Sequence, residues 1–168
     1  MTPSPGVAVR LARLRHELGI DLSALDARAA ELNEFSIANA AGPSDRTAGI
    51  VAAVNIHAWY TALETAFERV ARLLDESVPS GSAWHSELVS QMSVDVPGLR
   101  SALVGPCINL ELEDIRRFRH FFRNAYVLEF EFTRIRELAI QVTRVHTITR
   151  ASFQELIAHI GAVLESLK

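Results

Sequence analysis

The chain has 168 residues, of which 49% are hydrophobic and 22% are charged, and its formal net charge is −3. This length is that of one ordinary domain with a sizeable core, so we expect a single domain over residues 1–168. A slightly acidic chain does not attract nucleic acid through its overall charge, so an anion site requires local clustering of basic residues. Cys107 is the only cysteine, which excludes a disulfide framework and a cysteine-based metal site and favours a cytoplasmic protein.

No targeting or membrane segment is predicted. Residues 1–5 lack the basic stretch and apolar stretch of a secretory signal. The longest uncharged run, residues 47–63, contains Asn55, His57 and Tyr60 and is shorter than the roughly 20 apolar residues of a membrane-spanning helix. We therefore expect a buried core helix there and no contact with a membrane.

Apolar residues recur at helical spacing along the first half of the chain. The first predicted helix covers about residues 7–40 and carries a stripe of leucines. A Gly-Pro turn at 42–45 separates it from a second helix at about residues 45–75. After a turn at 79–82, the pattern predicts a short helix at 83–92.

The second half of the chain is also predicted to be helical. Residues 94–108 contain two glycines and two prolines and indicate an irregular connector. A fourth helix follows at about 110–127, and a last long helix at about 131–167. No segment has the alternation and β-branched enrichment of a strand. The sequence therefore predicts an all-α fold, an up-and-down bundle of four long helices plus one short helix.

The segment 116–126 concentrates four arginines and one histidine among aromatic residues. A helical projection at about 100° per residue separates it into two sides. The predicted apolar side consists of Ile115, Phe118, Phe121, Phe122 and Ala125. The predicted polar side consists of Arg116, Arg119, His120, Arg123, Asn124 and Tyr126. Arginine forks match phosphate oxygens bidentately, so the polar side suits a phosphodiester or nucleotide ligand.

The alternative is a solvated charged surface. Glu113 is placed to pair with Arg116 or Arg117, three and four residues later. Arg119 and Arg123 have no acidic residue at either spacing on their own helix. These two arginines therefore require an external anion, acids from another helix or a partner subunit.

A second polar cluster lies on one face of the second predicted helix, formed by His57, Tyr60 and Glu64. One interpretation is a satisfied polar cluster inside the bundle. The other is that the Glu64 carboxylate holds a catalytic arginine. None of the six histidines pairs with another at helical metal-site spacing, so we expect no metal and no cofactor.

These motifs resemble those of HEPN-domain proteins, specifically HepT-like toxins. The family pattern is Arg, four residues of which the first is polar, His, any residue and Tyr. In this chain Arg119 matches the arginine, His120 the polar position and Tyr126 the tyrosine, while Asn124 stands where the family has histidine. The resemblance covers most of the chain. It includes His57-x-x-Tyr60-x-x-x-Glu64, the Pro79…Trp84-His85 turn and Phe118-Arg119-His120.

The resemblance implies a metal-independent endoribonuclease with its site at a two-fold homodimer interface. RNA would be the substrate, with Arg119 stabilising charge on the phosphoryl oxygens and Arg116 and Arg123 binding phosphate. Asn124 cannot act as acid or base near neutral pH. Either His120 has taken over proton transfer, or RNA is cleaved weakly.

The resemblance also implies a partner, a small nucleotidyltransferase (MNT-like) antitoxin. In the family it transfers a nucleotide monophosphate to the motif tyrosine, here Tyr126. Two alternatives remain open: a non-catalytic HEPN dimer that serves as scaffold or nucleotide-binding partner, and an all-α domain whose arginines dock an acidic partner.

Overall fold

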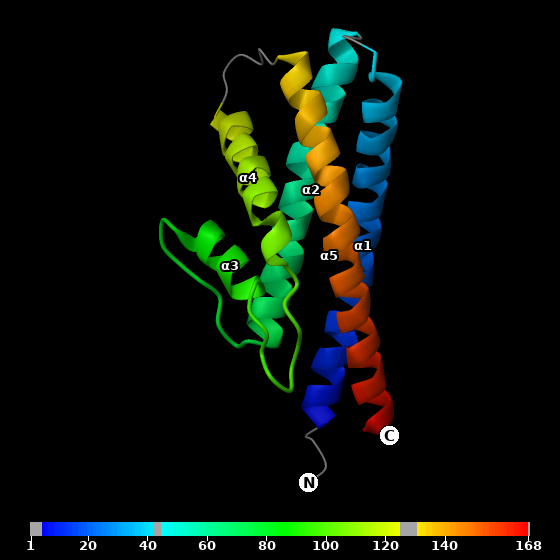
Figure 1. Cartoon of the computed structure of the whole chain (residues 1–168). Helices are drawn as coiled ribbons and strands as arrows, with labels where there is room; N and C mark the ends of the chain where they lie inside the picture. The colour runs from blue at the N-terminus through cyan, green and yellow to red at the C-terminus, as the bar shows by residue number, and fades with distance from the viewer. Residues whose placement is uncertain (1–4, 42–44, 125–130, 168) are drawn as a thin grey trace. The chain divides into compact units, whose positions relative to one another are not determined.

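A computed structural model describes residues 5–41, 45–124 and 131–167, and within them the chain is helical (Figure 1). The helices are α1 (Pro5–Ala38), α2 (Arg46–Leu73), α3 (Trp84–Met92), α4 (Asn109–Asn124) and α5 (Phe132–Ser166), and the short 3-10 helix η1 (Pro106–Ile108) precedes α4. These ranges contain no strand, only an isolated bridge between Val96 and Arg100. The all-α prediction is confirmed.

The predicted helix limits agree with the structure to within two residues for α1, α2, α3 and α5. The fourth helix was predicted to reach residue 127, and the structure describes it as far as Asn124. None of the described helices combines the length and apolar character needed to cross a bilayer.

The described residues form two compact units, each assembled from parts of several helices. The first unit consists of Met1–Ser23, Glu64–Pro106 and Ile148–Lys168, and the second of Ala24–Leu63 and Cys107–Thr147. The single domain expected from the length stays a prediction.

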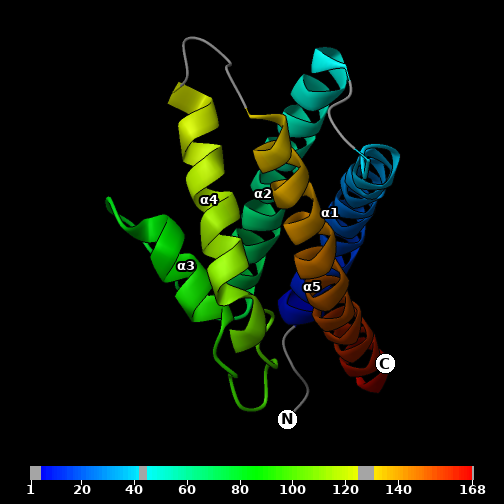
Figure 2. The same ribbon diagram turned by 45° about the horizontal axis from the view of Figure 1, so that its top comes forward.

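Helices in the second unit run antiparallel to their neighbours. Arg136 on α5 donates to the Ser36 carbonyl on α1 at 3.3 Å, whereas His146, later on α5, contacts Asp26, earlier on α1, at 2.8 Å. Contacts between α2 and α4 follow the same reversed order, and Figure 2 shows these two helices alongside each other. The second unit is therefore an up-and-down arrangement of four helical segments.

The core of the second unit consists of apolar side chains at three- and four-residue spacing on each helix. On α4 these are Leu112, Ile115 and Phe118, all buried. Trp59 on α2 is fully buried, and its indole N–H donates to His146 at 3.4 Å. This packing fixes the rotation of α4 and therefore the directions of its arginines.

In the first unit, an ion pair secures the connector that precedes α4. The Arg100 side chain is completely buried, and its guanidinium donates to both oxygens of Asp75, at 2.9 and 2.7 Å. Arg100 also donates to the carbonyls of Gln91 and Val94. The buried charge is thus paired and hydrogen-bonded, as a buried ion requires.

Candidate functional site

Helix α4 carries most of the candidate site, and its sequence favours a helix at this position. Glu111 lies in its first turn and Arg123 in its last, where each charge is favourable to the helix dipole. The buried apolar residues recur every three positions. The site residues are therefore held on a regular, packed helix.

Arg119 is buried, with only 9% of its surface exposed. Its Nε donates to the Thr61 hydroxyl on α2 at 3.3 Å, and its guanidinium carbon lies 5.7 Å from the centre of the Tyr60 ring. That distance allows a cation–π attraction. The guanidinium is consequently positioned by α2 before any ligand arrives.

The helical projection was wrong for two residues of α4. It placed Arg119 on the polar side and Phe121 on the apolar side that would face the core, whereas Arg119 is buried and Phe121 is 53% exposed. The reason is that α2 offers polar and aromatic groups, Thr61 and Tyr60, to the flank of α4 that carries Arg119. A polar partner makes burial of the guanidinium acceptable.

Arg116 and Arg117 share one carboxylate. Arg116 binds both oxygens of Glu113, at 2.7 and 2.8 Å, and the exposed Arg117 reaches one of them at 3.1 Å. The hydrogen bond from Arg116 holds the pKa of the Glu113 carboxyl below its usual value. A phosphate bound by Arg116 must therefore compete with Glu113.

The exposed end of α4 carries His120, Arg123 and Asn124. Within the described ranges, the side chains of His120 and Arg123 form no hydrogen bond or ion pair. The Asn124 amide donates to the His120 carbonyl, one turn earlier on the same helix, at 2.8 Å. Arg123 is thus available to an anion.

His57 on α2 faces the same part of α4. Its ring stacks on Phe122, with 5.0 Å between ring centres and 26° between planes. Burial lowers the pKa of His57 below its ordinary value of 6.5, and the charges of Arg119 and Arg123 lower it further. His57 Nδ1 is buried and has no hydrogen-bond partner among the described residues.

Of the remaining predicted site residues, Tyr60 lies beside Arg119, whereas Glu64 belongs to the other unit. Tyr60 is buried on α2 in the second unit. Glu64 is buried in the first unit, where one of its oxygens contacts His85 Nδ1 and the His85 ring packs on Trp84. A role of Glu64 in holding an arginine stays a prediction, and Tyr126 lies outside the described residues.

Sequence reasoning missed Thr61 and Phe122 as parts of this site. Thr61 lies one helical turn after His57, and its hydroxyl donates to the His57 carbonyl at 2.9 Å while accepting from Arg119. The four-residue spacing between His57 and Thr61 was the available signal. Phe122 was assigned to the core side, and no sequence signal indicated its stacking on His57.

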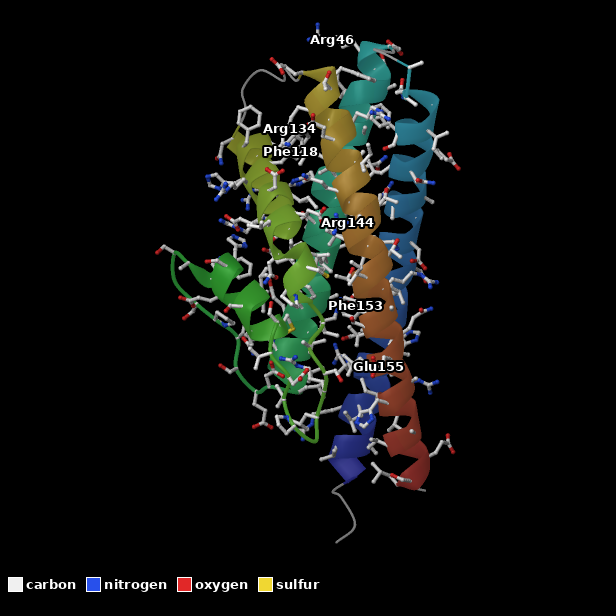
Figure 3. The ribbon with its side chains drawn as sticks, viewed as in Figure 1. Arg46, Phe118, Arg134, Arg144, Phe153 and Glu155 are labelled. Carbon is white, nitrogen blue, oxygen red and sulfur yellow. The ribbon has the colours of Figure 1, made fainter. Side chains whose placement is uncertain are left out.

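A hollow of about 360 Å³ lies beside the site in the second unit, between α4 and the start of α5. Phe118 and Arg134, both labelled in Figure 3, line it together with the exposed Phe121. Arg134 is paired with Asp114 at 2.5 Å. Three apolar residues, Phe118, Phe121 and Ile135, thus share the lining of this hollow with charged side chains, of which Arg134 is already paired.

The model of a family described as HepT-like protein matches residues 51–160, more than half of the chain. The chain belongs to the HepT-like protein family. The match includes every candidate site residue from His57 to Tyr126, and it supports a HEPN toxin-like function at the level of the family. No curated protein and no solved structure matches the chain significantly.

Proposed function

We propose that this HepT-like protein is a metal-independent ribonuclease toxin that cleaves RNA at the arginines of α4. The observation that carries the proposal is the buried guanidinium of Arg119, positioned by Thr61 and Tyr60. A charge fixed in advance and shielded from water stabilises developing negative charge most effectively. Arg123, one turn further along α4 and exposed, would bind the same phosphate.

In this reaction the RNA 2′-hydroxyl attacks the adjacent phosphorus. The bond from O2′ to phosphorus forms, the bond from phosphorus to O5′ breaks, and the products are a 2′,3′-cyclic phosphate and a 5′-hydroxyl. Arg119 stabilises the phosphoryl oxygens, Arg116 and Arg123 bind phosphate, and Asn124 orients it. His120 takes part in proton transfer.

The active form is proposed to be a homodimer in which two α4 helices face each other across a two-fold axis. Two large apolar residues of α4 support this arrangement: Leu110 is 88% exposed and Phe121 is 53% exposed. In a helical projection both lie on one side of α4, so a second α4 packed there would cover both of them.

The proposed partner is a nucleotidyltransferase antitoxin that attaches a nucleotide monophosphate to Tyr126. Family membership supports a toxin–antitoxin partnership. A phosphodiester on Tyr126 would bring negative charge toward Arg119 and Arg123 and compete with RNA for them. The proposed location is the cytoplasm, where RNA is available and a lone cysteine stays reduced.

The test compares RNA cleavage by wild type, Arg119→Met and Arg117→Met in the presence of a chelator. Arg119→Met should lower the rate by ~10²–10³, the usual effect of removing a positioned charge stabiliser. Arg117 is 72% exposed and bound to Glu113, so Arg117→Met should cleave like wild type. A folded Arg119→Met protein with undiminished cleavage would contradict the proposal.

The second candidate is a non-catalytic HEPN dimer that serves as scaffold or nucleotide-binding partner. It is favoured by Asn124, a residue that cannot titrate near neutral pH and whose amide donates to the His120 carbonyl.

Two substitutions distinguish the candidates. If the protein is a ribonuclease and His120 transfers a proton, His120→Ala should lower cleavage by ~10²–10⁴, and Asn124→His should change cleavage little. A rise in cleavage with Asn124→His would instead identify a weakened site. No effect of either substitution would favour the scaffold.

A further inference from the structure

The turn of α2 that carries His57 contacts α4 at two points. Its ring stacks on Phe122, the residue directly before Arg123. Its backbone carbonyl accepts from the Thr61 hydroxyl, which in turn accepts from Arg119. One turn of α2 thus positions both the guanidinium of Arg119 and the imidazole of His57.

The surroundings of His57 favour its neutral form. The charged groups placed against it are Arg119 and Arg123, both cationic and both on α4, and burial adds to their effect in lowering its pKa. An imidazole that stays neutral at neutral pH keeps a lone pair and is able to accept a proton. His120, the other nearby imidazole, is exposed at the surface of α4.

The ring also has an unused nitrogen. His57 Nδ1 is buried without a hydrogen-bond partner in the part of the chain that the structure describes. Such a group costs stability and requires an explanation, and a role in a reaction is one. The ring as a whole is only half-buried, so part of it remains reachable.

We propose that His57 is the general base of this site, the group that takes the proton from the RNA 2′-hydroxyl. The inference rests on the proposed ribonuclease function and adds a catalytic residue from α2. As O2′ bonds to phosphorus, its proton passes to the imidazole of His57. As the bond to O5′ breaks, the leaving oxygen takes a proton from His120. The site then needs no histidine at position 124.

In this proposal, the basicity of His57 depends on whether RNA is bound. A phosphate bound by Arg119 and Arg123 cancels the positive field that opposes protonation of His57. The proton affinity of His57 therefore rises once RNA is in place, and it falls again after the product leaves.

The kinetic test is the pH dependence of cleavage. For wild type, the acid side of the kcat/KM profile should have its midpoint below 6.5, because kcat/KM reports the free enzyme. The midpoint for kcat should lie at higher pH, because bound phosphate offsets the arginines. His57→Gln and His57→Phe should lower the rate by ~10²–10⁴, and the acid-side midpoint should be absent from their profiles. His57→Phe keeps a ring against Phe122. His159→Gln, an exposed histidine of the first unit, is the matched control and should retain both the rate and the midpoint.

Uridine 3′-monophosphate serves as a probe that is not cleaved. In a histidine NMR titration, it should raise the pKa of His57, leave that of His159 unchanged, and raise the pKa of His57 less in Arg119→Met, which keeps Arg123. A His57 pKa that does not respond to the nucleotide overturns the inference. If Arg119→Met loses cleavage but both His57 variants keep it, the role of His57 is overturned and the ribonuclease function stands. If wild type does not cleave RNA, both the ribonuclease function and the role of His57 are overturned.

Discussion

Arg119 is a charged residue that belongs both to the packed interior and to the proposed site. Its guanidinium is buried against Thr61 and Tyr60, so its removal leaves a hydroxyl and a ring without their partner. A helical projection alone would treat it as a solvated arginine that contributes little to folding. Burial changes that expectation.

We expect Arg119→Ala to lower the free energy of unfolding by about 1–3 kcal/mol, the cost of leaving a buried hydrogen-bonding partner unpaired. Urea denaturation measures this, and Arg117→Ala should stay within about 0.5 kcal/mol of wild type because Arg117 is exposed. Equal stability of Arg119→Ala and wild type would contradict the burial. Cleavage assays on Arg119 variants should therefore be run well below their melting temperatures.

His57 should make stability depend on pH. Its folded-state pKa lies below the ordinary value of 6.5 because of burial and then of Arg119 and Arg123. As the pH falls through 6.5, the unfolded chain binds a proton that the folded chain does not, so the free energy of unfolding decreases. His57→Phe should flatten this dependence between pH 7.5 and 5 in urea titrations, while the exposed His159→Gln should leave it unchanged. If the free energy of unfolding of His57→Phe depends on pH as steeply as that of wild type, other groups cause the dependence.

At the scale of the element, α4 divides its arginines into two kinds. Near its middle, Arg116 and Arg117 are paired with Glu113, and at its end Arg123 forms no ion pair with any described residue. One carboxylate thus reduces the positive field of the helix.

We expect Glu113→Gln to tighten RNA binding and to steepen its dependence on salt, because Arg116 becomes available to phosphate. Its cost in stability should be less than about 1 kcal/mol for partly exposed pairs. Since the Glu113 pKa is lowered, the contribution of Glu113 to the free energy of unfolding is present above the usual pKa of 4.5 and is lost as the pH falls through the folded-state pKa.

Fluorescence anisotropy measures the affinity for RNA. Glu137→Gln, which removes a similar pair with Arg134, is the control, and equal affinities of the two variants would exclude a phosphate role for Arg116.

At the scale of the whole molecule, the proposed function requires two chains. The large exposed side chains of α4, Leu110 and Phe121, lie on the same helix as the arginines. A two-fold axis beside α4 would cover them and bring together two sets of basic residues.

We expect a homodimer by light scattering at micromolar concentration. Phe121→Asp should produce monomers, because a charge at the centre of an apolar contact is left without a partner. Ile37→Asp changes a comparably exposed residue on α1 (67%) and should leave the dimer intact. A monomeric wild type, or dissociation of both variants, would contradict an interface on α4.

The sequence by itself determined the helices and the motif, because both depend on local spacing. Hydrogen bonds within a helix join residues four apart, so apolar periodicity was enough to predict all five helices. The order of Arg119, His120 and Asn124 likewise lies within one short segment, and family membership confirmed the resemblance based on it.

Only the tertiary structure decided which side of α4 is buried and what meets it. A projection gives the angles between side chains on one helix but contains nothing about the neighbouring helix. Thr61, 58 residues before Arg119, supplies the hydrogen bond that allows this arginine to be buried while Phe121 stays exposed. Phe122, which is also distant from His57 in the chain, stacks on the imidazole. Such contacts are made across helices, so the packing of α4 on α2, and not local spacing, sets the burial of Arg119 and lowers the pKa of His57.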